Sequence, residues 1–219
     1  MGAPVLGPDD QHHLERVLRL RAGDAVSVAD GRGRWRLCAL GDRGHLDPTG
    51  EVRDVPATTP LITIAFAVTK GERPELAVQK LTELGVDRIT VFHAHRSVAR
   101  WEGERAARHL ERLRRVSREA AVQSRRAWLP TVTELTDVAT LLSSPGSALA
   151  DPSGAPPSLA HPTVVVGPEG GFTAEERAVA HSMVRLGPLV LRAETAAMAA
   201  GTLLSGMRDG VVAPVDRPR

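Results

Sequence analysis

The spacing of apolar side chains changes character near residue 60. Before that point, residues 24–30 and 34–40 alternate apolar and polar positions, and the sequence Asp30-Gly31-Arg32-Gly33 between them has the glycine content of a tight turn. This pattern predicts a β-hairpin within a small β-rich domain. A stretch rich in threonine and proline, residues 56–60, follows and predicts a connection between two domains.

Beyond this connection, strand-like apolar runs alternate with helix-like periods. Residues 61–68 and 89–92 are rich in apolar and β-branched side chains, whereas residues 74–85 open with Pro74 and close with Gly85, as a helix does. Two further elements have the same character, a helix over residues 102–121 and a strand over residues 163–166. Strands that alternate with helices predict an α/β fold, with a parallel sheet covered by helices.

The order of elements is least distinct over residues 143–162, which are rich in serine, proline and glycine. We expect a single short strand there, at Ala148–Asp151. Taking the threonine and proline stretch as the boundary, we divide the chain into domains of residues 1–58 and 59–219.

Composition narrows the class of protein. With 219 residues, 42% of them hydrophobic and 25% charged, the chain has the balance of a folded soluble protein. Its most apolar run, residues 61–68, is far shorter than the ~20 residues of a membrane-spanning helix. The first ten residues lack the pattern of a secretory signal, so we expect a cytoplasmic protein without membrane contact. Cys38 is the only cysteine and the pair His12-His13 has no third ligand nearby, so we expect no disulfide and no metal site.

The net charge of +2 conceals an excess of basic residues in the middle of the chain. Residues 57–126 carry 14 Lys and Arg against 8 Asp and Glu. On a helix over residues 102–121, four arginines fall within about 80° of arc: Arg105, Arg108, Arg112 and Arg115. This stripe is either a solvated helix face or a surface for the phosphates of a nucleic acid. The chain has no tyrosine and only three Trp and three Phe, which favours recognition of shape and phosphate over base stacking.

A glycine loop follows the predicted strand at residues 163–166. The sequence Gly167-Pro168-Glu169-Gly170-Gly171-Phe172 leads into Thr173, and Glu176 three residues later completes the pattern of a capping box. A glycine loop at the carboxyl end of a parallel strand lets the backbone approach a ligand closely. The loop lacks both the phosphate-binding pattern of ATP proteins and the G-x-G-x-x-G pattern of dinucleotide proteins. It is therefore either a tight structural turn or a site for a different ligand.

A second such segment spans residues 186–196. It predicts a turn at Leu186-Gly187-Pro188, a short strand, and the start of a helix rich in small residues. Arg192 and Glu194 are charges in an otherwise apolar stretch, so they need partners if they are buried. They form either a structural ion pair or a pair that orients a ligand.

Six motifs in this order resemble those of a known family, and together they extend over nearly the whole chain. They are His13-Leu14-Glu15-Arg16-Val17-Leu18-Arg19-Leu20-Arg21 with Gly23-Asp24, then Gln79-Lys80-Leu81-Thr82-Glu83-Leu84-Gly85-Val86, Arg96-Ser97, Glu119-Ala120-Ala121-Val122-Gln123-Ser124-Arg125-Arg126 with Pro130, the glycine loop, and residues 186–195. The chain resembles the RsmE family of 16S rRNA uridine N3-methyltransferases, within the SPOUT superfamily. It departs from the family motif at Leu189, where the family has arginine, and at Ala193, where the family has threonine.

The resemblance implies a PUA-like β-barrel for RNA at residues 1–58 and a SPOUT methyltransferase domain at residues 59–219, whose C-terminal part forms a trefoil knot. The knot would hold S-adenosylmethionine. The cofactor residues that the resemblance implies are Gly167, Pro168, Glu169, Gly170, Gly171, Leu186, Gly187, Leu191, Arg192 and Thr195. Relatives act as homodimers on the 30S subunit, where their target is one uridine of 16S rRNA, uridine 1498.

Methylation at N3 of uridine needs help with a proton, because the N3 lone pair becomes available only as that proton leaves. We expect Arg192 to stabilise the developing anion or the cofactor carboxylate, with Glu194 or Glu169 as the base or as an orienting group. The residues expected to contact rRNA are His13, Arg16, Arg19, Arg96, Arg105, Arg108, Arg112, Arg115, Arg125 and Arg126. Two alternatives remain open at this point, an inactive RNA-binding or ribosome-assembly protein with this fold and a SPOUT methyltransferase that acts on another RNA.

Overall fold

The computed structural model describes residues 6–7, 10–11, 14, 16 and 19–213, and these form two compact units. One unit comprises Met1–Ala57 together with Arg125–Leu129, and the other comprises Thr58–Ser124 with Pro130–Arg219. The sequence did not indicate that Arg125–Leu129 packs with the N-terminal part of the chain. Residue His13 and its neighbour His12, considered above as RNA or metal contacts, lie outside the described residues.

The first unit is built on an antiparallel sheet. Its strands are β1 (Ala25–Ala29), β2 (Arg34–Leu40), β3 (Leu46–Pro48) and β4 (Arg53–Asp54), with the 3-10 turn η2 (Asp42–Gly44) before β3. The order is β1-β2-β3, and β4 pairs with β2. The predicted hairpin of β1 and β2 is confirmed, with Ala29 opposite Trp35 beside the turn. The carboxylate of Asp30 stabilises this turn by accepting hydrogen bonds from the backbone N–H groups of Arg32 and Arg34, at 2.8 and 3.0 Å.

The segment Arg125–Leu129 joins this unit through its backbone and one side chain. The backbone N–H of Gly33 donates to the carbonyl of Ala127 at 3.0 Å, and the indole N–H of Trp128 donates to the carbonyl of Val55 at 2.9 Å. Gly33 has φ +94°, and a Cβ on it would lie 2.5 Å from the Trp128 ring. Glycine is therefore required at this position both for its conformation and for the close approach of the indole.

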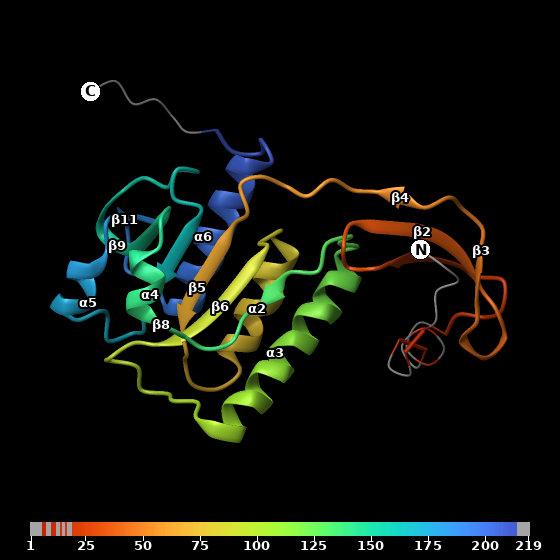
Figure 1. The fold of residues 1–219 in the computed structure, drawn as a ribbon, viewed down its shortest axis with the longest axis horizontal. Helices are drawn as coiled ribbons and strands as arrows, with labels where there is room; N and C mark the ends of the chain where they lie inside the picture. The colour runs from red at the N-terminus through yellow and green to blue at the C-terminus, as the bar shows by residue number, and fades with distance from the viewer. Residues whose placement is uncertain (1–5, 8–9, 12–13, 15, 17–18, 214–219) are drawn as a thin grey trace. The chain divides into compact units, whose positions relative to one another are not determined.

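The second unit is an α/β fold around a parallel sheet, which confirms the predicted class (Figure 1). The strand order is β11-β9-β10-β5-β6-β7, with β8 also paired to β6, and each of these pairs is parallel. The strands are β5 (Thr63–Ala67), β6 (Arg88–His93), β7 (Thr131–Val132), β8 (Thr136–Asp137), β9 (Ser147–Ala155), β10 (Thr163–Val166) and β11 (Met183–Val184).

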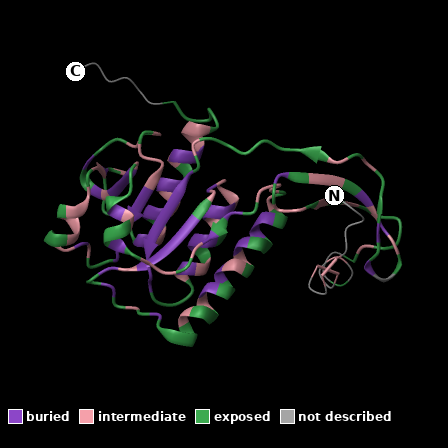
Figure 2. Cartoon of the chain, in the orientation of Figure 1, coloured by how far each residue is buried: buried purple, intermediate pink, exposed green. Residues whose placement is uncertain are grey.

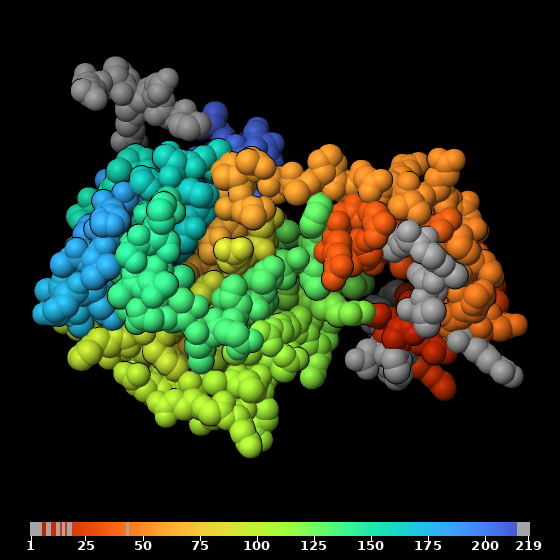
Figure 3. Space-filling view, in the orientation of Figure 1, coloured from red at the N-terminus to blue at the C-terminus, as the bar shows by residue number. Residues whose placement is uncertain are grey.

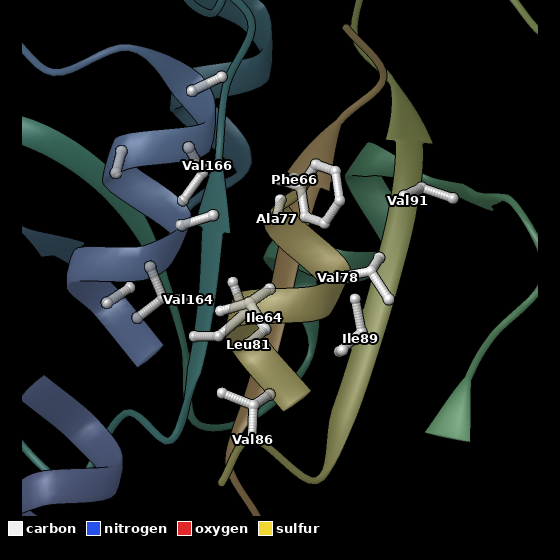
Figure 4. Packing of buried hydrophobic residues seen from close by; sticks show 14 of the residues in the cluster. Ile64, Phe66, Ala77, Val78, Leu81, Val86, Ile89, Val91, Val164 and Val166 are labelled. Carbon is white, nitrogen blue, oxygen red and sulfur yellow. The ribbon is translucent and has the colours of Figure 1, made fainter. Parts of the chain in front are cut away.

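Helices cover both faces of this sheet. The larger core contains apolar residues of α2 (Arg73–Glu83), α3 (Gly103–Gln123) and α6 (Ala193–Arg208). Figure 4 shows this packing, with Ala77, Val78 and Leu81 of α2 among the apolar side chains of β5, β6 and β10. The opposite face packs against α4 (Val138–Ser143) and α5 (Ala174–Val179). The central strands are consequently buried on both sides (Figure 2), as a parallel sheet requires.

Two predicted strands differ from the structure. The short strand expected at Ala148–Asp151 is present but continues to Ala155, because Gly154 permits the backbone of β11 to approach closely; a Cβ there would lie 2.5 Å from Val184 N. The strand expected within residues 186–196 is wrong. The sheet receives Met183–Val184 instead, and the following Leu189 and Val190 are 76% and 89% exposed. These two apolar residues resemble a strand in the sequence, but no strand among the described residues pairs with them.

Candidate functional site

The strand order reverses between β5 and β10. From β5 the chain proceeds through α2 to β6 on one side, whereas β10 and β9 lie on the other side. In open α/β sheets, ligands bind outside the carboxyl ends of the strands where the order reverses in this way. Since the strands are parallel, the loops that follow β5, β6 and β10 all emerge at this edge, which is where a ligand site is expected.

The glycine loop after β10 is a tight turn with a solvent-facing tip. The N–H of Gly171, which has φ +69°, donates to the carbonyl of Pro168 at 2.8 Å. A Cβ on Gly167 would lie 2.7 Å from the ring of Phe172, which is buried and stacks on Phe92 with ring centroids 6.4 Å apart. The buried phenylalanine thus holds the loop from inside while Glu169 and Gly170 are exposed.

The predicted capping box at the end of this loop is confirmed. The Thr173 hydroxyl accepts a hydrogen bond from the N–H of Glu176 at 3.2 Å, and the Glu176 carboxylate accepts one from the N–H of Thr173 at 2.8 Å. The second oxygen of Glu176 accepts the backbone N–H of His95 at 2.8 Å. One carboxylate therefore begins α5 and also connects it to the loop that follows β6.

Arginines from two neighbouring loops hold the tip of the glycine loop. Arg96, after β6, donates to the carbonyl of Gly170 at 3.1 Å, and a Cβ on Gly170 would lie 3.2 Å from its Cβ. Arg73, the first residue of α2 after β5, pairs with the carboxylate of Glu169 at 2.8 Å. Arg96 was expected to contact RNA; the structure places it beside the glycine loop.

The same Arg73 also reaches the second predicted segment. Its Nε lies 3.8 Å from Oε1 of Glu194, in the first turn of α6. The Glu194 side chain is only 11% exposed, and its Oε2 is buried with no hydrogen-bond partner among the described residues. Within that part of the chain the ion-pair partner of Glu194 is thus Arg73 and not Arg192, which lies exposed at the N-cap of α6. Sequence reasoning missed Arg73, although its position directly before the predicted helix start at Pro74, in the connection after a predicted strand, was a usable signal.

The remaining predicted cofactor residues lie along the approach to α6. Leu186 and Leu191 are partly buried and pack against the larger core. At Gly187 there is no atom within 4 Å of a Cβ position, and Thr195 is exposed in the first turn of α6. The structure therefore joins Glu169 to Glu194 through Arg73, and it leaves Leu186 and Gly187 in the connection between β11 and α6.

His93, at the carboxyl end of β6, has its charge state set by its surroundings. Its Nε2 accepts the backbone N–H of Trp101 at 2.9 Å. Burial lowers the pKa of His93, the positive charge of Arg100 lowers it further, and Glu102 opposes both. A neutral imidazole fits the accepting role, because a protonated ring has no lone pair for the Trp101 N–H.

The arginine stripe on α3 is exposed, as predicted. Arg105, Arg108, Arg112 and Arg115 face solvent, whereas Leu110, Leu113 and Ser117 are buried. The helix lies at the surface of its unit (Figure 3). Arg112 is already paired with Glu75 of α2 at 3.1 Å and with Glu72, the N-cap residue of α2, at 3.5 Å, so its charge is partly neutralised.

The other predicted RNA contacts are distributed over the first unit. Arg16 and Arg19 are exposed, and Arg125 and Arg126 belong to the segment that packs with this unit. Arg125 is exposed with φ +55°, and Arg126 is half-buried.

The groove between α2 and α3 has a mostly acidic lining, which disfavours the binding of phosphate. Its lining includes four glutamates, Glu72, Glu75, Glu83 and Glu119, against two arginines. No cluster of three or more metal-ligating side chains occurs among the residues described. None of the helices that the structure describes is both long and apolar enough to cross a membrane.

With this geometry in place, comparison with known proteins defines the class. Residues 57–205 match the family model of the RNA methyltransferase domain, and residues 6–47 match that of the RNA methyltransferase PUA domain. The architecture and both matches are therefore those of an RNA methyltransferase.

Individual relatives narrow the class to one family. The ribosomal RNA small subunit methyltransferase E of Mycobacterium bovis is 34% identical, over 90% of this chain and 83% of the relative. That of Bacillus subtilis is 30% identical, over 90% of this chain and 87% of the relative. The chain belongs to the ribosomal RNA small subunit methyltransferase E family, RsmE, which confirms the resemblance seen in its motifs.

Solved structures agree with this assignment. The Neisseria gonorrhoeae ribosomal RNA small subunit methyltransferase E bound to S-adenosyl methionine superimposes with a TM-score of 0.78 at 25% identity, covering 92% of this chain and 90% of that chain. A putative methyltransferase from Legionella pneumophila, in complex with the bound cofactor SAM, gives a TM-score of 0.79 at 26% identity, with the same coverage of both chains.

Proposed function

We propose that this protein binds S-adenosylmethionine at the carboxyl edge of its parallel sheet and methylates N3 of one uridine in 16S rRNA, the family target uridine 1498. The observation that carries the proposal is the network in which Arg73 joins Glu169 of the glycine loop to Glu194 of α6. Two segments that the family resemblance assigns to one pocket meet there. Relatives named as small-subunit methyltransferases, and related structures with this cofactor bound, support the cofactor and the substrate class.

The residues at this edge fit the cofactor. Glu194 Oε2 is a buried acceptor without a donor among the described residues, and the cofactor carries N–H and O–H donors in its ammonium and ribose groups. The exposed tip of the glycine loop and the open surface at Gly187 would let the cofactor approach the protein backbone closely. The proposed binding set is Gly167, Pro168, Glu169, Gly170, Gly171, Leu186, Gly187, Leu191, Arg192 and Thr195. When bound, the cofactor supplies an electrophilic methyl group on a sulfonium.

The chain's own residues would hold the uridine and deal with its N3 proton. Arg192 is exposed at the N-cap of α6, where a guanidinium can stabilise negative charge that develops on the uracil ring. Glu194 or Glu169 accepts or orients the N3 proton. Alignment of the attacking nitrogen with the methyl group contributes a large part of the rate, because holding both reactants in place turns a bimolecular step into an effectively unimolecular one.

The departures from the family motif leave this network intact. Leu189 is 76% exposed, and Ala193 is buried at the first position of α6. Neither residue takes part in the ion pairs of Arg73. This arrangement favours an active enzyme over the inactive alternative.

We also propose the finer architecture of the family for this chain. Residues 1–58 would form a PUA-like barrel that binds RNA, and the C-terminal part of residues 59–219 would form the trefoil knot around the cofactor. The functional unit would be a cytoplasmic homodimer on the 30S subunit, without metal. The match of residues 6–47 to a PUA domain supports the first assignment, and size-exclusion chromatography with light scattering would test the dimer.

The decisive experiment supplies the cofactor and 30S subunits that lack the modification. The purified protein is incubated with both, and the methylated nucleotide and its methyl position are mapped by mass spectrometry. N3-methyluridine at the family position supports the proposal. Cofactor binding without methylation of this RNA favours a different RNA target, and no cofactor binding at all favours the non-catalytic alternative.

Single-turnover rates of Arg192→Ala and Glu194→Gln test the assigned roles. Both variants should lose at least tenfold in methyl-transfer rate at saturating cofactor, in line with the loss of one general acid–base or electrostatic contact. Near-normal rates would show that these residues have no role in methyl transfer, although the protein would still be an active methyltransferase.

A further inference from the structure

Arg73, at the carboxyl edge of the sheet, contacts acidic residues of two separate segments. It is the first residue of α2 and follows β5, the strand beside the reversal in strand order. Its guanidinium contacts Glu169, 96 residues later in the sequence, at 2.8 Å, and lies 3.8 Å from Oε1 of Glu194. One cation therefore lies between carboxylates of two separate segments.

This arrangement solves an electrostatic problem. Arg73 pairs with both Glu169 and Glu194, so without its guanidinium the two carboxylates would be left as like charges that repel each other. With the guanidinium between them, the tip of the glycine loop is drawn toward α6. Arg73 and Glu169 are 41% and 45% exposed, and ion pairs of that exposure stabilise a fold by only about 0–1 kcal/mol. The consequence of the contact is therefore local geometry, with little effect on overall stability.

A second arginine fixes the other side of the loop tip. Arg96 donates to the carbonyl of Gly170 at 3.1 Å, and the narrow gap between its Cβ and Gly170 leaves little room for a side chain there. With the backbone held by Arg96, the remaining freedom of the tip is the direction of the Glu169 side chain. That direction is set by Arg73.

We propose that Arg73 is a positioning residue of the S-adenosylmethionine site, which it forms by holding Glu169 and Glu194 at a fixed separation. The proposal rests on the proposed function of this site. Arg73 lies on the Oε1 side of the Glu194 carboxylate, with its Nε 3.8 Å from that oxygen. Oε2, which is buried and has no hydrogen-bond partner among the residues described, is left as the acceptor for a ligand donor. Arginine suits this role because its planar group offers Nε and Nη donors in different directions.

The test measures cofactor affinity in the absence of RNA. Isothermal titration with S-adenosylmethionine compares wild type with Arg73→Ala and Arg73→Lys. We expect Arg73→Ala to weaken binding at least tenfold and Arg73→Lys to recover part of the loss, because lysine retains the charge but not the two directed donors. The matched control is Arg114→Ala on α3. Arg114 also joins two carboxylates, Glu111 and Glu134, with 37% exposure, yet lies outside the proposed site, so its loss should leave cofactor affinity unchanged.

A double-mutant cycle identifies the residue through which Arg73 acts. The variant Arg73→Ala with Glu169→Gln should lose less affinity than the two single losses combined, since either change removes the same contact. Amide hydrogen exchange supplies a readout that does not depend on activity. In Arg73→Ala, exchange should accelerate at residues 169–172 and at the start of α6, with β5 and β6 unchanged.

The outcomes separate this inference from the proposed function. Wild type that does not bind the cofactor would overturn the proposed function itself. Wild type that binds, together with an Arg73→Ala variant of equal affinity and unchanged exchange, would overturn the positioning role alone. Equal weakening by Arg73→Ala and Arg114→Ala would also overturn it, because the effect would then belong to surface charge in general.

Discussion

Arg208 and Asp87 form a buried ion pair between residues 121 apart in the sequence. Their Nη1 and Oδ2 atoms are 2.5 Å apart, and their side chains are only 5% and 14% exposed. Asp87 also accepts the backbone N–H of Ile62 at 2.8 Å, and Arg208 donates to the carbonyl of Gly85 at 3.1 Å. This pair connects the last turn of α6 with the residues that precede β5 and β6, at the end of the sheet opposite the proposed site.

Removal of the arginine should therefore destabilise the fold. Arg208→Ala leaves the Asp87 carboxylate buried without its cation, and we expect the free energy of unfolding to fall by about 3 kcal/mol. Chemical denaturation at neutral pH measures this. Arg115→Ala, an exposed arginine of α3, is the control and should change the unfolding free energy by less than about 0.5 kcal/mol. Equal small effects from both variants would contradict the prediction.

Gly167 should tolerate no side chain. In Gly167→Ala the new methyl group would lie 2.7 Å from the Phe172 ring, which must then shift from its present stacking position on Phe92. Overpacking of this kind costs about 1–3 kcal/mol of unfolding free energy, and the displaced loop should also weaken binding of S-adenosylmethionine. Gly187→Ala is the control for stability, since no atom lies within 4 Å of its Cβ position. An unchanged denaturation midpoint in Gly167→Ala would show that the ring is not the constraint.

His93 should make stability depend on pH. Burial and then Arg100 lower its pKa in the folded state, so in acid the unfolded chain binds a proton more readily than the folded chain. The stabilisation is fully present above the unfolded value of about 6.5 and is lost as the pH falls below it. Unfolding free energies measured between pH 8 and pH 5.5 should show this decline.

A replacement that keeps the acceptor identifies His93 as the source. His93→Gln retains an oxygen that can accept the Trp101 N–H but does not titrate in this range. The decline between pH 7 and pH 5.5 should become shallower in this variant.

The α3 arginines should contribute unequally to RNA binding. Arg112 is paired with Glu72 and Glu75, whereas no ion pair involves Arg108 among the residues that the structure describes. Arg108→Ala should therefore weaken binding to 16S rRNA more than Arg112→Ala. It should also reduce the slope of log affinity against log salt concentration by about 0.7–0.9, the value for one phosphate contact. Equal slopes in both variants and wild type would remove the α3 face from the RNA-binding surface.

The sequence by itself determined the elements whose causes are local. The β1–β2 hairpin follows from alternation around a glycine turn, the buried face of α3 follows from the spacing of Leu110 and Leu113, and the capping box follows from Thr173 and Glu176. Each depends on residues that are close together in the sequence, so the sequence pattern alone predicts it. The family motifs belong to the same level, since they are short and ordered along the chain.

Tertiary structure decided which distant segments meet. Leu189 and Val190 have the composition of a strand, but the sheet pairs Met183–Val184 with β9 and leaves them exposed. Arg125–Leu129 follows a helix of the second unit yet packs with the first. Arg73 meets Glu169 and Glu194 because the parallel strand order brings the loops after β5 and β10 to one edge. Strand order depends on how helices pack against both faces of the sheet. It therefore cannot be predicted from the periodicity of apolar residues, which reflects only residues close together in the sequence.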